Sequence, residues 1–224
     1  MTTVTPPPAA TDGLLRASVY EELRRRFVTG KIMPGSSLST RGVAAELGVS
    51  QMPVREALSR LAAEGAVEIR SKRRIVVPLM TADRFKDLLR CRELLEPEAA
   101  AAALAHIDAA RLKHLRGVDD ALGVALKTGD VTGYMEGNFD FHFSIYRAQP
   151  RRTMTQLIET LWLQFGPYMR VVYGRVGTAS LVDQHQLAIR AIRERNATRL
   201  KRAILADIRD GMGLIGKSGF EPGA

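Results

Sequence analysis

The sequence predicts a mainly α-helical protein, with an N-terminal winged helix-turn-helix followed by a C-terminal antiparallel bundle of about six helices. Three observations support this fold class. Short apolar-periodic segments broken by glycine fill residues 13–65, a β-like stretch follows over 66–79, and helical patterns with short breaks continue over 81–216. The 224 residues therefore divide into a disordered Pro/Thr-rich arm over 1–12, a winged domain over 13–79, a helical domain over 80–217 and a tail over 218–224.

The winged part begins with two helices separated by a loop. Apolar side chains recur at helical spacing over residues 14–27, and this pattern ends near Gly30. The following segment, KIMPGSSL, contains a Pro-Gly pair and is expected to form a loop. A second helix over residues 40–47, capped by a serine or threonine, ends at Gly48.

A third helix and a hairpin complete the winged part. The helix is capped by Ser50, tolerates Pro53 in its first turn and stops at Gly65. Its predicted buried stripe consists of Val54, Ala57, Leu58 and Leu61. Two short strands over residues 66–69 and 75–79 then flank a turn. Two helices joined at a glycine turn and followed by a hairpin form a winged helix-turn-helix, whose second helix enters the DNA major groove.

The second part reads as six helices joined by short connections, which favour antiparallel neighbours in a bundle. Serine, threonine and aspartate caps and the breaks at glycine and proline set their approximate bounds. The expected ranges are 81–106, 108–128, 130–148, 153–173, 180–195 and 198–215.

The charge of the chain indicates a polyanionic partner. The formal net charge is +9, and residues 11–80 contain 12 basic and 7 acidic side chains. Nucleic acid is the commonest partner of a protein this basic, although a generally basic proteome gives the same balance. The chain has no apolar run of 18 residues and no signal peptide at its start, so we expect no membrane span and a cytoplasmic location. Its one cysteine, Cys91, lies in an apolar-periodic stretch and is expected to be buried and inert.

Basic clusters within the winged part favour double-stranded DNA. They comprise Arg24–Arg26, the pair Arg41 and Arg55, and the turn over residues 70–74. Arginine fits phosphate and guanine edges with two hydrogen bonds. Arg24–Arg26 can equally be a solvated face. The side chains that begin the third helix and are expected to read bases are Ser50, Gln51 and Met52.

Four polar residues in the helical part form a candidate metal site. Asn138 and His142 lie four residues apart on one helix face, while His185 and Asp207 come from later helices. A bundle can bring such groups together at its centre. Imidazole and oxygen ligands suit zinc, nickel, manganese or iron without choosing among them. The two other histidines, His106 and His114, are interpreted as surface or packing residues.

The segments VTGKIMPGSSL, RGVAAELGVS and PVREALSRLAAEGAVEI closely resemble the N-terminal domain of the GntR family of bacterial regulators. With the helical part, the chain from Leu14 to Ile215 looks like the FadR-type subfamily, which has an FCD-type effector domain. The resemblance implies that Arg41 and Arg55 contact DNA and that a wing tip reaches the minor groove or backbone. The residues of that tip are Ser71, Lys72 and Arg73. Gln51 and Met52 replace the family's usual arginine and threonine, and glutamine prefers adenine, so we expect an altered half-site.

The resemblance also bears on the candidate metal site. FCD domains commonly have Asp or Asn four residues before a Phe-His pair, which matches Asn138 and His142, then a histidine that matches His185. A third histidine of the family is replaced here by Asp207. The site is therefore either a modified metal site or one that has lost its metal. Metal-binding FCD domains typically sense small organic acids through the metal.

Two further residues are candidates for effector binding. Arg92 matches a cavity arginine of the family, and arginine pairs well with carboxylates, but Arg92 can equally pair with Glu96 one turn away. Tyr134 could line the same cavity or fill the core. Similar alternatives hold for Tyr168 and Arg170, whereas Trp162 is expected to be a core residue.

These observations together predict a homodimeric, operator-binding repressor that a small carboxylate effector relieves. Two other classes compete with this interpretation. A metal-dependent enzyme could use His142 and His185, but the chain has no HExxH motif, phosphate loop or paired nucleophile and base, so we expect no catalysis. A sequence-neutral architectural protein would bind operator and scrambled DNA equally.

Overall fold

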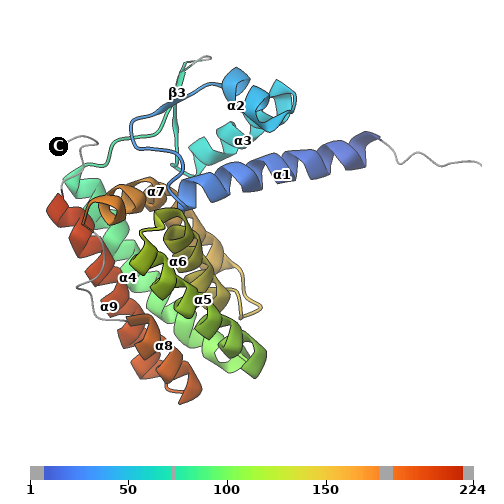
Figure 1. The fold of residues 1–224 in the computed structure, drawn as a ribbon. Coiled ribbons are helices and arrows are strands. Elements are labelled where there is room, and N and C mark those ends of the chain that lie inside the picture. The colour runs from blue at the N-terminus through green and yellow to red at the C-terminus, as the bar shows by residue number, and fades with distance from the viewer. Residues whose placement is uncertain (1–7, 72–73, 177–183, 219–224) are drawn as a thin grey trace, which may run out of the picture.

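A computed structural model describes residues 8–71, 74–176 and 184–218 of the chain, as a winged domain joined to a helical bundle (Figure 1). The winged domain contains α1 (Pro8–Val28), α2 (Thr40–Leu47) and α3 (Gln51–Ala63), with strands β1 (Ser37–Leu38), β2 (Glu68–Ser71) and β3 (Arg74–Val76). The bundle contains α4 (Ala82–Ala103), a 3-10 turn (Leu104–His106), α5 (Ala109–Thr128), α6 (Val131–Tyr146), α7 (Thr153–Val176), α8 (Gln184–Arg193) and α9 (Ala197–Ser218). The predicted mainly helical fold class is confirmed.

Local sequence signals set the ends of the helix-turn-helix. The Ser39 hydroxyl accepts a hydrogen bond from the Gly42 amide and caps α2, and Gly48 ends that helix in the left-handed conformation with φ of 66°. Ser50 stands at the start of α3 without a side-chain capping bond. The predicted inner stripe of α3 is buried, with Leu58 and Leu61 fully enclosed.

The wing is a three-stranded antiparallel sheet in the order β1-β3-β2. Ser37 pairs with Val76 of the central strand, and Glu68 pairs with Val76 from the other side. β1 lies in the segment expected to be a loop. Two residues are too short to show a strand periodicity, so only the partner strand identifies it.

Six helices form the bundle of the described residues, as predicted, and most of their starts are capped by side chains. Thr81, Asp108 and Asp130 accept hydrogen bonds from backbone amides at the starts of α4, α5 and α6. α4 packs against α9, α5 against α6, and α8 against α9. None of the described helices combines the length and apolar character that a membrane crossing requires.

The winged domain and the bundle meet where α1 crosses α7. Gly166 of α7 lies against the backbone of α1, so a Cβ there would lie 2.6 Å from the Val28 Cα and even closer to the Phe27 carbonyl oxygen. Gly30, with φ of 66°, faces the same turn, and a Cβ on it would lie 2.8 Å from the Gly166 carbonyl oxygen. One continuous hydrophobic core includes Phe27 and Leu163 from the two sides. The domains therefore share a tight, glycine-dependent junction.

Two sequence predictions are corrected by the structure. α1 begins at Pro8, so the described part of the expected disordered arm is helical; proline is tolerated in a first helical turn and Ala9 and Ala10 favour a helix. Cys91 is exposed rather than buried. The inner face of α4 is instead occupied partly by charged residues, Arg92 and Glu96, which the apolar pattern could not indicate.

Candidate nucleic-acid interface and buried polar cluster

The first turn of α3 presents side chains to solvent at the place expected for a recognition helix. Gln51, Met52 and Arg55 are exposed, and Met52 is 63 % exposed despite its apolar side chain. The opposite face of the helix, with Val54 and Leu58, is fully buried against the rest of the winged domain. An exposed methionine beside an amide and a guanidinium is suited to contact with thymine methyl groups and base edges.

Arg41, in the first turn of α2, is exposed like Arg55. Within the described part of the chain, no ion pair within 4 Å involves either guanidinium. Ser71 ends β2 on the exposed side of the wing, whereas Lys72 and Arg73 lie outside the described residues. Arg41 and Arg55 thus keep their charge available for an external phosphate.

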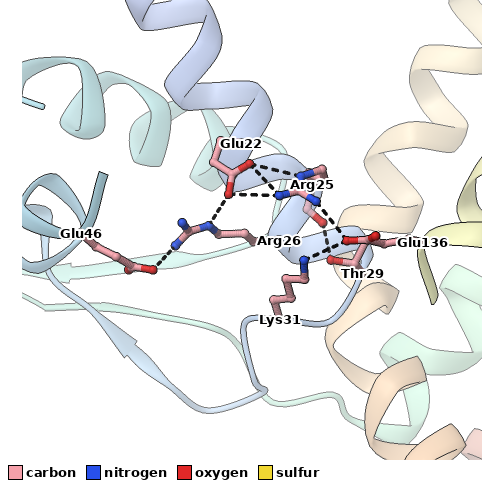
Figure 2. A network of polar contacts seen from close by, with 7 residues as sticks. All are labelled: Glu22, Arg25, Arg26, Thr29, Lys31, Glu46 and Glu136. Atoms are coloured by element: carbon pink, nitrogen blue, oxygen red, sulfur yellow. Dashed lines mark hydrogen bonds and ion pairs between the residues drawn. The ribbon is translucent and has the colours of Figure 1, made fainter. Parts of the chain in front are cut away.

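Arg24, Arg25 and Arg26 on α1 all form ion pairs with glutamates of other helices. Arg25 pairs with Glu136 of α6 at 3.0 Å, and Arg26 pairs with Glu46 of α2 at 2.7 Å (Figure 2). Arg24 forms an ion pair at 2.7 Å with a glutamate of α7. These arginines are engaged in ion pairs that link α1 to α2 and to the bundle.

Lys31 extends the same network, because its Nζ lies 2.8 Å from the Glu136 carboxylate that Arg25 also contacts (Figure 2). We call Arg25, Lys31 and Glu136 the junction network. The network joins the end of α1 to α6. Elsewhere in the winged domain, Glu56 pairs with Arg16 at 3.2 Å, and Arg60 pairs with Glu64.

Two imidazoles and a carboxylate meet inside the bundle. His142 of α6, His185 of α8 and Asp207 of α9 place one ligand atom each within 4.8 Å of one another. The His142 Nε2 lies 3.1 Å and the His185 Nε2 lies 3.6 Å from an oxygen of Asp207. Both histidines are buried. We call these three residues the His–His–Asp cluster.

Polar groups also contact the Nδ1 atom of each imidazole, on the side away from Asp207. The His142 Nδ1 lies 3.1 Å from the Tyr146 hydroxyl, whose own proton is donated to Glu96 at 2.8 Å. The Tyr146 hydroxyl is therefore placed to accept a hydrogen bond from the His142 Nδ1, while the His142 Nε2 faces the Asp207 carboxylate. The His185 Nδ1 lies 3.4 Å from an oxygen of Asp119. The Asp207 carboxylate and the imidazole nitrogens that face it are electron-rich, so a proton or a cation is expected between them.

The electrostatics of Asp207 fit this description. Burial alone would raise the pKa of its carboxyl, but the hydrogen bond with His142 and the electrostatic interactions with His185 and Arg92 outweigh burial and lower that pKa to about 2. Asp207 is therefore an anion at neutral pH. An ionised carboxylate with two imidazoles is a donor set for a divalent metal.

The sequence-derived candidates around the cluster have different environments. Arg92 is buried and forms an ion pair with Glu96, the alternative considered from the sequence, and its guanidinium lies 4.7 Å from the Trp162 ring centroid. Asn138 lies one turn before His142 and is 4 % exposed. The ring of Tyr134 packs against that of Tyr173 at 4.8 Å between centroids.

The remaining aromatic and basic candidates have structural contacts. Tyr168 donates to the Pro78 carbonyl at 3.0 Å and so holds the segment between β3 and α4. Arg170 donates to Thr132 at 2.9 Å, and Trp162 is fully buried as expected. Both donors come from α7, the helix that crosses α1.

Two residues of the cluster's surroundings were not found from the sequence: Tyr146 and Asp119. Tyr146 follows His142 by four positions and so stands one helical turn from it. That spacing is the signal that could have indicated Tyr146. Asp119 lies on α5, and no sequence spacing connects it with His185.

A winged helix with an exposed recognition turn, joined to a bundle that encloses a polar cluster, defines the class of two-domain transcriptional regulators that bind DNA. Comparison with known proteins identifies the family. The gntR family of bacterial regulatory proteins matches residues 15–77, and the FCD domain matches residues 87–210. The chain belongs to the GntR family, in its FadR-like subfamily with an FCD domain.

The similarity of this chain to two transcriptional regulators extends over most of the length of both proteins. The chain is 28 % identical to the HTH-type transcriptional regulator McbR of Escherichia coli K12 over 185 residues, 81 % of this chain and 84 % of that protein. It is 30 % identical over 189 residues to the gluconate operon transcriptional repressor of Bacillus subtilis 168, which covers 80 % and 75 % of the two chains. The solved structure of E. coli McbR/YncC superposes with a TM-score of 0.85 at 25 % identity, covering 91 % of this chain and 98 % of that one.

Proposed function

We propose that this regulator represses transcription as a homodimer on a pseudo-palindromic operator and that a small organic acid, bound in the helical domain with a divalent metal, relieves repression. GntR regulators bind operators and form dimers. FCD domains often bind metals. The observation that carries the sensing part is the buried His–His–Asp cluster, in which three potential ligand atoms from three helices lie within 4.8 Å.

The spacing of the cluster supports a metal. Two ligands at about 2.1 Å from one ion lie roughly 3.0–3.4 Å apart for angles between square and tetrahedral. The distances from Asp207 to the two imidazole nitrogens, 3.1 and 3.6 Å, are close to that range. His142, His185 and Asp207 would hold the ion, with Asn138 as a fourth ligand, and zinc, nickel, manganese or iron suits such a set.

The bound ion would supply a Lewis-acid contact for a carboxylate. Arg92 would add positive charge on the same side, since its charge already acts on Asp207. Tyr134 and Tyr173 would line the position of the ligand. Burial, and then the nearby Tyr134 and Asp207, raise the pKa of the Tyr173 hydroxyl. Glu96 accepts hydrogen bonds from Arg92 on both of its carboxylate oxygens and from Tyr146 on one of them, which holds both side chains in place.

On the DNA side, the exposed first turn of α3 would read bases. Ser50, Gln51 and Met52 would lie along the major groove, and the amide of Gln51 favours adenine. Arg41 and Arg55 would bind phosphates, and the wing residues Ser71, Lys72 and Arg73 would contact the backbone or minor groove.

The first experiment measures metal content by mass spectrometry of protein purified without chelator or nickel resin, for wild type, His142→Ala and His114→Ala. His114 is an exposed histidine paired with Asp140 and serves as the matched control. We expect stoichiometric metal in wild type and His114→Ala and its loss in His142→Ala. Equal metal content in all three proteins, or none in any, would contradict the metal site.

The second experiment measures operator affinity with and without a panel of small carboxylates, using scrambled DNA as the reference. We expect at least one carboxylate to weaken operator binding in wild type but not in His142→Ala. Specific operator binding that no carboxylate changes would overturn the sensing proposal and leave the DNA-binding assignment in place. Equal affinity for operator and scrambled DNA would instead overturn the sequence-specific part.

A further inference from the structure

A second polar cavity lies at the loop between α6 and α7, away from the His–His–Asp cluster. Its volume is about 580 Å³, comparable to a site for a small metabolite. Its lining includes Arg147, Gln149, Arg151, Arg152 and Thr155. We call it the loop pocket. None of its lining residues belongs to the His–His–Asp cluster or to the exposed face of α3.

Gln149 is the buried polar group of this pocket. Its side chain is only 8 % exposed, and its Nε2 atom has no hydrogen-bond partner in the described part of the chain. A buried amide nitrogen left without an acceptor costs free energy of the order of 1–3 kcal/mol. Such a donor indicates that an acceptor from outside the chain completes the site.

The other groups of the pocket also supply donors and positive charge. Arg151 and Arg152 are exposed, and arginine has five N–H groups and no acceptor. Arg152 directly precedes α7, so its side chain cannot accept a hydrogen bond and cap the helix. The amides in the first turn of this 24-residue helix therefore add a partial positive charge toward an anion.

One carboxylate lies in the lining, and it is already engaged. Glu159 accepts two hydrogen bonds from Arg147, at 2.6 and 3.1 Å, and pairs with Arg24 of α1 at 2.7 Å. Three arginines against one glutamate leave the pocket with an excess of two positive charges. The side of the pocket near Glu159 adjoins the contact between α1 and α7.

We propose that the loop pocket binds a small oxyanion, a metabolite with a phosphate or carboxylate group, through the Gln149 amide and the guanidinium groups of Arg151 and Arg152. The anion supplies the acceptor that the Gln149 amide lacks and pairs with the two exposed guanidinium groups. Charge-assisted hydrogen bonds from arginine to either group are of similar geometry, so the pocket selects oxyanions as a class.

The test is calorimetric titration with inorganic phosphate and with succinate at constant ionic strength. It uses the full chain in the His142→Ala background, so that a carboxylate bound at the His–His–Asp cluster does not contribute. The variants are Gln149→Leu, Gln149→Glu and Arg151→Gln. Arg116→Gln, which removes one exposed arginine on α5, is the charge-matched control.

We expect saturable binding of at least one anion, a Kd raised at least tenfold by Gln149→Leu and by Arg151→Gln, and no change in Arg116→Gln. Gln149→Glu keeps the size of the side chain and abolishes binding by repulsion, which tests the site even if the leucine variant does not fold. Preference for phosphate or succinate then identifies the group on the ligand. Absence of saturable binding by both anions, or unchanged affinity in both Gln149 variants, would overturn the proposal. Because the background lacks His142, these outcomes are independent of the proposed effector site.

Discussion

Replacing Gly166 with alanine tests whether the close contact between α1 and α7 holds the two domains together. The added Cβ would lie 2.6 Å from the Val28 Cα, and unstrained carbon–carbon contacts lie at about 3.5–4.0 Å. The neighbouring atoms are backbone rather than flexible side chain, so relief requires α1 and α7 to separate by about 1 Å.

The magnitude follows from two opposing effects. Alanine is more favourable than glycine inside a helix by about 1 kcal/mol, whereas overpacking of this kind typically costs about 1–3 kcal/mol or more. Since backbone must move, we expect a net loss of about 2 kcal/mol. For a chain of this size, that lowers the midpoint of thermal unfolding by about 4–8 °C.

The assay is thermal unfolding followed by circular dichroism, with Gly117→Ala as the matched control. Gly117 also lies within a helix, but a Cβ there would have no atom within 4 Å, so the control should gain up to about 1 kcal/mol from helix propensity alone. A Gly166→Ala protein as stable as the Gly117→Ala protein would refute the reasoning, because it would show that the junction yields without cost.

Three further predictions concern DNA reading, the junction network and acid stability. Gln51→Arg should shift the preferred base at one position of each half-site from adenine toward guanine by about tenfold, measured by competition binding with operator variants; an unchanged preference would remove Gln51 from the base-reading surface. Glu136→Gln leaves Arg25 and Lys31 without their shared partner, and because these groups are partly exposed it should cost less than about 1 kcal/mol in thermal unfolding; a larger loss would mean that the network is more than a surface contact. The hydrogen bond from Arg26 holds the pKa of Glu22 below its ordinary value of 4.5. The stability that ionised Glu22 contributes is therefore fully present above pH 4.5 and is lost as the pH falls through the lowered pKa of the folded state. Glu22→Gln should flatten this part of the profile of stability against pH, and an unaltered profile would contradict the linkage.

The sequence predicts those parts of the molecule that depend on residues close together along the chain. Apolar periodicity and capping residues place the helices of the winged domain and the bundle, and the inner stripe of α3 is buried as expected. The same patterns are wrong for Cys91, because the buried Arg92–Glu96 pair stabilises an inner face that is not apolar. Arg24–Arg26 are ambiguous in sequence for a related reason: Arg25 finds its partner on α6, 111 residues away.

The candidate site shows the same limit in its chemistry. The sequence supplies His142, His185 and Asp207, since histidine is rare in the chain, the two histidines match a family pattern and Asp207 stands at the place of that family's third histidine. It does not supply Asp119, which comes from another helix, or the direction of each imidazole. The direction of the His142 ring depends on the chain of hydrogen bonds from His142 through Tyr146 to Glu96, and that of the His185 ring on Asp119. Only the packed bundle fixes which nitrogen is free to bind.

α6 offers a physical route between the two domains. Glu136 of the junction network and His142 of the cluster lie on this one helix, six residues and therefore about 9 Å apart along its axis. An unbroken helix of this length moves as a unit, so a displacement of His142 on ligand binding would reach Glu136 with little loss. From Glu136 it would pass to Arg25 and Lys31, on either side of the end of α1. α1 also packs against the recognition helix α3, and the Tyr20 hydroxyl donates to Glu64 just after α3 ends. The proposed effector would therefore act on the DNA-binding surface through two helices and one charged contact.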